Sequence, residues 1–422
     1  MSDGQAPTPE PGPPGESPAP TPAQPAPGLV ERYTLAQRAA GLVAPVITAV
    51  ISFLLGGLVI LASTGKAPWG VYQEIFKGAG LSWFFEVGNY KVGLPFTDTR
   101  VWFPWNVNDV ESLAASNLQQ TLITTTTLML TGLAVAFAFR CGLFNIGGQG
   151  QYIAGAILAV IIGSKLDGLS PFLHVVLAIV LGTLGGALLA GIAGYLKATV
   201  GTHEVIATIM LNWTVIWIGV FLFTLGGPLQ NEESGSPISH DVVEGSKLSV
   251  FWGDPLLQGL HIGFFIGLLA LVVYWAVLNR TTLGYGVRAV GFNPEAARYG
   301  GINVSRNYFL AMAISGAFAG LAGAIDIIGW QFRISQGDIL TSSVGFVGIA
   351  VALLGRNTAI GVGLGALLFG SLLTGTSTRN LDPEVFKPEL ASNLTLLIQG
   401  LIVLFVGADV LVVWLIAKAR RR

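Results

Sequence analysis

The chain has 422 residues, of which 52% are hydrophobic and only 11% are charged, and its formal net charge is -1. Soluble domains carry about 25% charged residues, so this composition excludes an ordinary soluble protein and indicates a membrane protein. The near-zero charge gives no basis for nucleic-acid binding, and four histidines with one cysteine exclude a disulfide framework and argue against a Cys/His metal site. We therefore predict an all-α fold, a polytopic membrane helix bundle.

The N-terminal segment, residues 1–30, is rich in proline. Ten of the 21 prolines lie in it, separated mainly by small and polar residues, and such a segment cannot bury a core. We expect a disordered cytoplasmic tail that acts as a tether or, alternatively, as a proline-rich docking ligand. It lacks the basic start and apolar core of a signal peptide. Residues 31–422 are predicted to form the transmembrane domain.

About ten apolar segments follow, most of them near the roughly 20 residues that cross a bilayer. Residues 64–116 are predicted to form an external insert with short helices, and residues 226–257 a second external loop. With both termini in the cytoplasm, 13 of the 22 Lys and Arg residues fall on the cytoplasmic side, in agreement with the positive-inside rule. The predicted spans are about 41–63, 118–139, 143–163, 172–199, 204–225, 260–278, 308–330, 339–354, 359–373 and 394–416.

Two glycine- and serine-rich interruptions occur at matching places in the two halves, at residues 139–150 and 329–348. They indicate a weak internal repeat with broken or re-entrant segments, a pattern typical of transporters with a pathway near the membrane midplane. The eighth span, at 339–354, is short, so a broken or re-entrant helix is an alternative there.

Polar side chains in the first interruption and in the fifth span are candidates for a substrate pathway. Lipid cannot satisfy amide groups, so these side chains must face protein or a water-filled cavity. In the fifth span they recur at i, i+4 and i+8 and therefore share one helix face. Helix contacts sealed by side-chain hydrogen bonds are the alternative. The candidates are Asn145, Gln149 and Gln151 in the first interruption, and Glu204, Thr208 and Asn212 in the fifth span.

Other residues in the spans are ambiguous. Two lone acids, Asp326 and Asp409, could belong to a proton relay, but one acid per helix favours structural pairing. Arg140 or Arg356 could pair with Asp409. The spacing of Gly316 and Gly320 predicts close helix packing. Four aromatic residues could stack on a flat solute, although aromatic residues in spans usually serve packing: Phe144, Tyr152, Trp213 and Trp217.

The cytoplasmic loop 280–306 contains the sequence of one short, well-capped helix. Asn293 can cap the N-terminus, Pro294 suits the first helical position, and Glu295 lies where the helix dipole favours a carboxylate. Ala296, Ala297 and Arg298 continue the helix, and two glycines end it. Such a helix on a cytoplasmic surface suggests contact with a partner; an ordinary loop with a helical turn is the alternative.

Three stretches resemble the permease subunits of bacterial ABC importers of the nucleoside and simple-sugar type, which are related to branched-chain amino acid permeases. They are Gly-Phe-Asn-Pro-Glu-Ala-Ala-Arg-Tyr-Gly-Gly-Ile at 291–302, Phe-Asn-Ile-Gly-Gly-Gln-Gly-Gln at 144–151, and the segment 201–213. The family often has a glutamate where Gln149 stands, so no charge-dependent role is carried over to it.

The resemblance implies a permease rather than an enzyme, with no catalytic residues, that imports nucleosides or, alternatively, simple sugars across the bacterial inner membrane. The implied partners are a cytoplasmic ATPase docked on residues 293–298, a second and often different permease subunit, and an external solute-binding protein or lipoprotein. This chain has no Gly-x-x-x-x-Gly-Lys-Ser/Thr motif, so no cofactor is expected on it and the ATPase would bind the ATP. An ion-coupled secondary transporter is the rival from another class.

Overall fold

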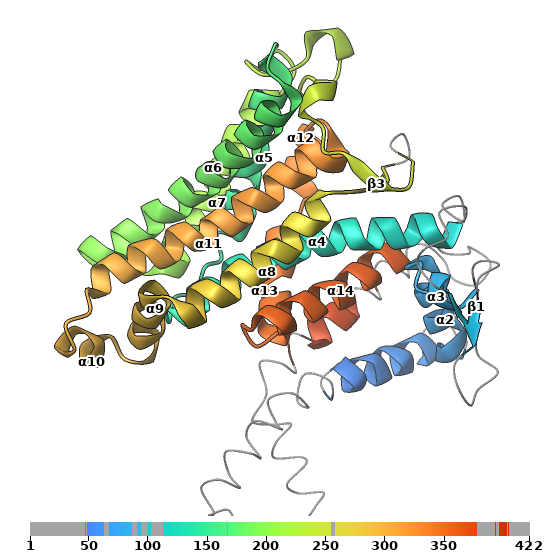
Figure 1. Ribbon diagram of the computed structural model, residues 1–422, viewed down its shortest axis with the longest axis horizontal. Helices are drawn as coiled ribbons and strands as arrows, with labels where there is room; N and C mark the ends of the chain where they lie inside the picture. Colours follow the sequence, from blue (N-terminus) through green and yellow to red (C-terminus); the bar gives the residue numbers. More distant parts are fainter. Residues whose placement is uncertain are drawn as a thin grey trace, which may run out of the picture. The chain divides into compact units, whose positions relative to one another are not determined.

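The computed structural model describes residues 47, 49–62, 67–86, 91–93, 100–102, 113–166, 168–254, 258–377, 393, 396–402 and 404, all of which lie in one compact unit, residues 45–422 (Figure 1). The predicted tail, Asp409 and most of the predicted tenth span lie outside the described residues. In chain order the longer elements are α2 (Pro68–Gly78), α3 (Trp83–Glu86), α4 (Leu113–Arg140), α5 (Gly148–Lys165), α6 (Pro171–Val200), α7 (Glu204–Phe223), α8 (Gly263–Arg280), α9 (Thr282–Phe292), α10 (Pro294–Tyr299), α11 (Val304–Asp326), α12 (Gln336–Thr341), α13 (Val344–Leu354) and α14 (Ala359–Gly375).

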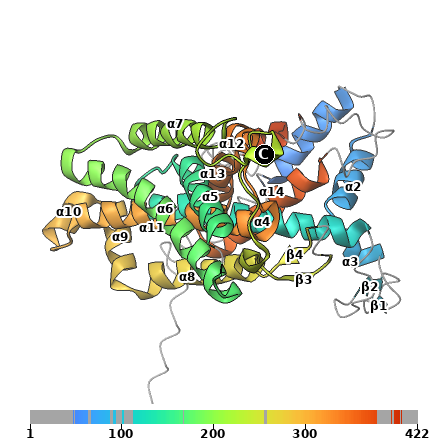
Figure 2. The same ribbon diagram turned by 90° about the horizontal axis from the view of Figure 1, so that it is seen from above.

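Helices α4 and α11 form the centre of the bundle. Six of the described helical segments are long and apolar enough to cross a membrane, and two shorter apolar helices accompany them. The apolar windows of α4 and α11 are 83% and 78% buried, against 28% to 39% for the other four. Helices α5, α6, α13 and α14 pack around this pair (Figures 1 and 2). The structure thus confirms the predicted polytopic helix bundle.

Helices α6, α7 and α8 expose large apolar side chains along one side of their length. On α7, Trp213, Trp217 and Phe221 are more than half exposed, while Thr208 and Asn212 on the opposite face are buried. A helix with an apolar exposed face and a polar buried face is expected where lipid or another membrane subunit covers the outside. The bundle therefore turns its polar groups inward.

Helices α6 and α11 pack through glycines. A Cβ atom placed on Gly316 would lie 2.2 Å from the carbonyl oxygen of Gly186, and one placed on Gly320 would lie 2.5 Å from that of Gly182. Any larger residue at these positions would force the helices apart, because the obstacle is main chain and cannot rotate away. The close packing predicted from the glycine spacing is confirmed.

Both predicted interruptions are present. The first separates α4 from α5 over residues 141–147, and the second begins where α11 passes into a π-helical turn, Ile327–Gln331. Residues 342–343 then separate α12 from α13. The predicted eighth span is therefore broken, as the alternative proposed: α12, which begins after the Ser335–Asp338 capping box, ends at Thr341, and α13 begins at Val344.

Short strands occur in the predicted external segments and at the start of the predicted sixth span, in addition to the expected short helices. Strand β1 (Lys91–Gly93) pairs antiparallel with β2 (Arg100–Trp102), and β3 (Val250–Trp252) pairs antiparallel with β4 (Leu260–His261). These two small hairpins are an exception to the all-α expectation, since two-stranded ladders need no helical periodicity in the sequence. Both hairpins lie beside the end of α4 that is next to α3 (Figures 1 and 2).

The loop between α8 and α11 is more helical than predicted. Asn293 caps α10 as expected, since its Oδ1 accepts hydrogen bonds from the backbone amides of Glu295 and Ala296 at 2.9 and 3.0 Å. Residues 282–292, expected as part of a loop, instead form α9. Its N-cap, Thr281, accepts from the amide of Gly284, and that glycine packs directly on the backbone of α8.

Candidate functional site

Two of the predicted pathway residues stabilise the first interruption through hydrogen bonds. Asn145 donates from Nδ2 to Gln151 Oε1 at 2.8 Å and to Ser315 Oγ at 2.7 Å. Its Oδ1 accepts from the Gly147 amide at 2.8 Å and from Gln151 Nε2 at 3.0 Å. Asn145 and Gln151 are both buried. Their amides therefore tie the turn between α4 and α5 to α11.

The predicted polar stripe of α7 faces this turn. Asn212 accepts from the Gly150 amide at 2.8 Å and donates to the Ile146 carbonyl at 2.9 Å. Thr208 donates back to the carbonyl of Glu204 at 2.8 Å. At the end of the stripe, the Glu204 carboxylate lies 2.8 Å from Lys197 Nζ on α6. In this conformation the stripe is paired with protein groups.

Gln149 connects the two interruptions. Its Oε1 accepts from the backbone amide of Gly345, at the start of α13, at 2.8 Å. The contact is close, since a Cβ atom on Gly345 would lie 2.2 Å from the backbone nitrogen of Gln149. Gln149 Nε2 is buried and has no hydrogen-bond partner in the part of the chain that the structure describes. The matching breaks that the sequence shows in its two halves therefore meet in space, and they leave one amide donor unused.

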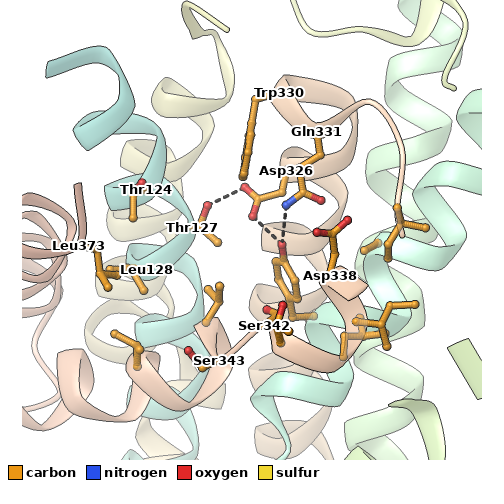
Figure 3. A pocket seen from close by; sticks show the side chains of 18 residues that line it. Thr124, Thr127, Leu128, Asp326, Trp330, Gln331, Asp338, Ser342, Ser343 and Leu373 are labelled. Atoms are coloured by element: carbon orange, nitrogen blue, oxygen red, sulfur yellow. Dashed lines mark hydrogen bonds between the residues drawn. The ribbon is translucent and has the colours of Figure 1, made fainter. Parts of the chain in front are cut away.

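A cavity of about 280 Å³ lies next to this meeting point, between α4, α5, the π-helical turn, α12 and α13 (Figure 3). Its most buried charged residue is Asp326. Asp326 Oδ1 accepts from Thr127 Oγ1 on α4 at 2.6 Å, and Oδ2 accepts from Tyr152 Oη on α5 at 2.7 Å. Within the described residues Asp326 is thus hydrogen-bonded to two hydroxyl groups and is not paired with a cation.

Among the four aromatic residues considered for stacking, Tyr152 lines this cavity. Trp213 and Trp217 lie on the exposed face of α7, and Phe144 stacks on Phe139 with ring centroids 5.0 Å apart. Trp330, which the sequence analysis did not select, has its ring beside the Asp326 carboxylate (Figure 3). The sequence signals for this site were the lone acid Asp326, the aromatic residue Tyr152 and the second interruption, residues 329–348.

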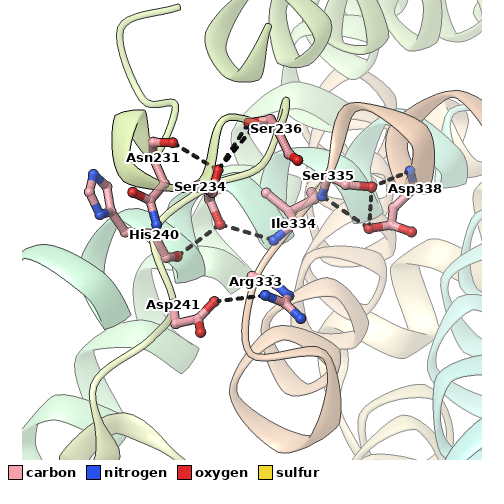
Figure 4. A network of polar contacts seen from close by, with 10 residues as sticks. Asn231, Ser234, Ser236, His240, Asp241, Arg333, Ile334, Ser335 and Asp338 are labelled. Carbon is pink, nitrogen blue, oxygen red and sulfur yellow. Dashed lines mark hydrogen bonds and ion pairs between the residues drawn. The ribbon is translucent and has the colours of Figure 1, made fainter. Parts of the chain in front are cut away.

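The segment after the π-helical turn covers one end of the cavity and is bound by the loop between α7 and β3. The Ser239 amide donates to the Ile334 carbonyl at 2.9 Å, and Asp241 lies 3.7 Å from Arg333 (Figure 4). Ser335 and Asp338 form the capping box of α12 within the same network. The loop 226–250 therefore holds the segment 332–338 in place.

Helix α10 lies at the other end of the bundle from this segment. It directly precedes α11, whereas residues 332–338 follow the π-helical turn that continues α11 (Figure 1). Together α11 and the turn span 28 residues, or roughly 40 Å at 1.5 Å per residue. The capped helix and the covered cavity end are thus separated by the length of one membrane span.

The surface of α10 carries charge and aromatic side chains together. Glu295 and Arg298 are exposed and 3.5 Å apart, while Ala297 is buried. Phe292, the last residue of α9, and Tyr299, the last residue of α10, are 93% and 97% exposed. Exposed aromatic groups beside charges are typical of protein interfaces. Neither residue was predicted from the sequence to be a contact.

Comparison with known proteins identifies the chain. Residues 117–407 match the family described as branched-chain amino acid transport system / permease component. The chain belongs to this permease family. The permease is 37% identical over 310 residues to the guanosine ABC transporter permease protein NupP of Bacillus subtilis, which covers 72% of this chain and 84% of the relative.

Two further relatives carry different substrate names. The permease is 31% identical over 386 residues to the nucleoside ABC transporter permease protein NupB of Lactococcus lactis, covering 89% of this chain and 93% of that protein. It is 32% identical over 313 residues to the glucose ABC transporter permease protein TsgB13 of Haloferax volcanii, covering 71% and 79%.

These similarities confirm that the chain is an ABC transporter permease, a multi-pass membrane protein and not an enzyme. They exclude the alternative that the sequence alone allowed, an ion-coupled secondary transporter. An ABC transporter permease works with an ATPase and a substrate-binding protein, because the permease itself supplies only the membrane passage.

Proposed function

We propose that this permease forms the translocation pathway of an ATP-driven importer of nucleosides. The observation that carries the proposal is the cavity at the meeting of two broken helices, which combines apolar walls with a buried, hydroxyl-bonded carboxylate. A nucleoside has a flat base that suits apolar walls and hydroxyl groups that suit polar ones. The guanosine and nucleoside permeases among its relatives support this substrate class.

The candidate pathway residues belong to the same proposal. Asn145, Gln149 and Gln151, with the α7 stripe Glu204, Thr208 and Asn212, lie around the junction of the first and second interruptions. In the present conformation these side chains are paired with protein groups, most often backbone amides and carbonyls of the two interruptions. During alternating access the broken helices would re-pack, and the amides would exchange protein partners for solute.

The proposed power source is a cytoplasmic ATPase that binds the ATP and contacts Asn293, Pro294, Glu295, Ala296, Ala297 and Arg298. A second permease subunit, different from this one, would complete the pathway, and an external binding protein or lipoprotein would deliver the solute. The proposed location is the bacterial inner membrane, with both termini in the cytoplasm. The exposed charge and aromatic groups of α10 support the docking role.

The test is uptake into proteoliposomes that contain this chain with its ATPase and second permease subunit. We expect labelled guanosine to accumulate only when ATP and the ATPase are both present. Changing Gln149 to Leu should reduce this uptake, because it removes the unpaired Nε2 donor and the bond to Gly345. ATP-independent uptake of guanosine would contradict the proposal.

Simple sugars are the second candidate class, favoured by the glucose permease among the relatives. They share the hydroxyl groups of ribose but lack a base. Competition separates the two classes: excess glucose should leave guanosine uptake unchanged if nucleosides are the substrates. Strong inhibition by glucose, with weak inhibition by guanosine itself, would favour the sugar class.

A further inference from the structure

The cavity beside the second interruption has a one-sided charge. Its described lining contains two carboxylates, Asp326 and Asp338, and no lysine, arginine or histidine. Electrostatic interactions are stronger in a low-dielectric interior than in water, so this lining attracts hydrogen-bond donors and repels anions. The charge pattern therefore selects among solutes of similar shape.

Asp326 has the geometry of a residue that recognises donors. The residue is 2% exposed, and its two oxygens are oriented by Thr127 and Tyr152 from two different helices. A carboxylate can accept about four hydrogen bonds, so positions remain for a solute. Within the described chain, Asp326 forms no ion pair.

A second polar group in the same cavity is the hydroxyl of Ser342, at the break between α12 and α13. It is buried and has no hydrogen-bond partner among the described residues. Buried polar groups normally have a partner, and an exception in a cavity indicates a place for a ligand atom. Ser342 and Asp326 both line this space, and the ring of Trp330 lies beside the carboxylate (Figure 3).

The rest of the lining is largely apolar and can hold a flat ring. A ligand placed there would rest on side chains such as Leu128, Ile153, Ile339, Val347 and Leu373 while its donors reach the carboxylate. This is the usual arrangement of a small-molecule site, in which apolar walls supply contact area and a few polar groups fix orientation.

We propose that Asp326 determines specificity in this permease: it accepts hydrogen bonds from a pair of adjacent donors on an uncharged nucleoside and excludes the phosphorylated form. The inference rests on the proposed nucleoside function. Two parts of a nucleoside offer such a pair, the 2′,3′-diol of ribose and the N1–H and 2-amino edge of guanine. Both match the two oxygens of a carboxylate.

The test compares inhibition constants in the complete transporter, reconstituted with its partner subunits. Labelled guanosine is the substrate, and guanosine and guanosine 5′-monophosphate are the competitors. The quantity compared is the inhibition constant of guanosine 5′-monophosphate divided by the inhibition constant of guanosine. We expect this ratio to fall at least tenfold in Asp326→Asn, because a neutral amide no longer repels phosphate. The control Glu233→Gln removes an exposed acid outside the cavity and should keep the wild-type ratio.

A properly folded Asp326→Asn transporter with an unchanged ratio overturns the inference. If that variant fails to assemble, Ser343→Lys supplies the test, because Ser343 is an exposed cavity-lining residue and a cation there should also lower the ratio. An unchanged ratio in Ser343→Lys would then overturn the inference.

Two further competitors identify the donor pair. 2′,3′-Dideoxyguanosine lacks the diol, and inosine lacks the 2-amino group. If one of these competitors binds the wild type more weakly than guanosine does, but binds Asp326→Asn as well as guanosine does, then the group that it lacks is the group that Asp326 contacts. If neither competitor behaves in this way, the result counts against the inference. A wild-type transporter that imports no guanosine refutes the nucleoside function together with this inference, whereas guanosine import with an unaltered ratio refutes the inference alone.

Discussion

Replacement of Asn145 by Ala tests whether the first interruption depends on its amide network. The side chain makes four hydrogen bonds, to Gln151, Ser315 and the Gly147 amide, and all of them are lost in the variant. Buried side-chain bonds contribute about 0.6 kcal/mol each in membrane proteins and about 1 kcal/mol in soluble ones, so the expected loss of stability is about 2–4 kcal/mol.

The assay is thermal unfolding of the purified transporter in detergent or nanodiscs, with uptake measured per folded molecule. We expect the melting temperature to fall by on the order of 5 °C. The matched control is Asn279→Ala, which removes one exposed bond, to the Trp275 carbonyl, and should change the melting temperature little. Equal melting of the two variants would refute the network argument. Near-normal uptake per folded molecule would assign Asn145 a purely structural role.

Three other predictions concern packing and coupling. Glu295→Arg reverses an exposed charge of α10 and should uncouple ATP hydrolysis from uptake, with the melting temperature unchanged. The measurement is the amount of ATP consumed per guanosine imported, and a wild-type value would contradict docking of the ATPase on α10. Phe292→Ala should reduce copurification of the ATPase several-fold, whereas Phe221→Ala on the exposed face of α7 should not; equal recovery would exclude Phe292 as an anchor. Gly320→Ala should reduce the amount of folded protein strongly, because the new Cβ would meet the α6 backbone. In the control Gly70→Ala the new Cβ would have no atom of the described residues within 4 Å; similar yields of the two variants would show that α6 can move away.

Local sequence signals predicted α10 and gave a break in the eighth span as an alternative. Asn293, Pro294 and Glu295 each satisfy a requirement of a helix N-terminus, and these requirements involve only neighbouring residues. The break before α13 followed from a span that was too short to cross the membrane. Helix α9 was missed because Gly284 and Gly286 have low helix propensity, and contacts with other helices override that preference.

The cavity could not be predicted, because its parts come from distant places in the chain. Thr127 and Tyr152 are separated from Asp326 by 199 and 174 residues, and no periodic pattern links them. The sequence marked Asp326 as unusual but could not show that its partners are hydroxyl groups on two other helices. The same limit applies to Gln149 and Gly345, whose contact joins the two halves.

The glycine contact between α6 and α11 has a consequence for motion. Two helices that touch through their main chains have little freedom to shift independently, so they are expected to travel as a rigid body. A displacement that starts at α10 would then be carried undiminished along α11, and the flexing must occur at its far end. The π-helical turn and the Ser342–Ser343 break are positioned to serve as the hinges, next to the chamber that the solute would enter.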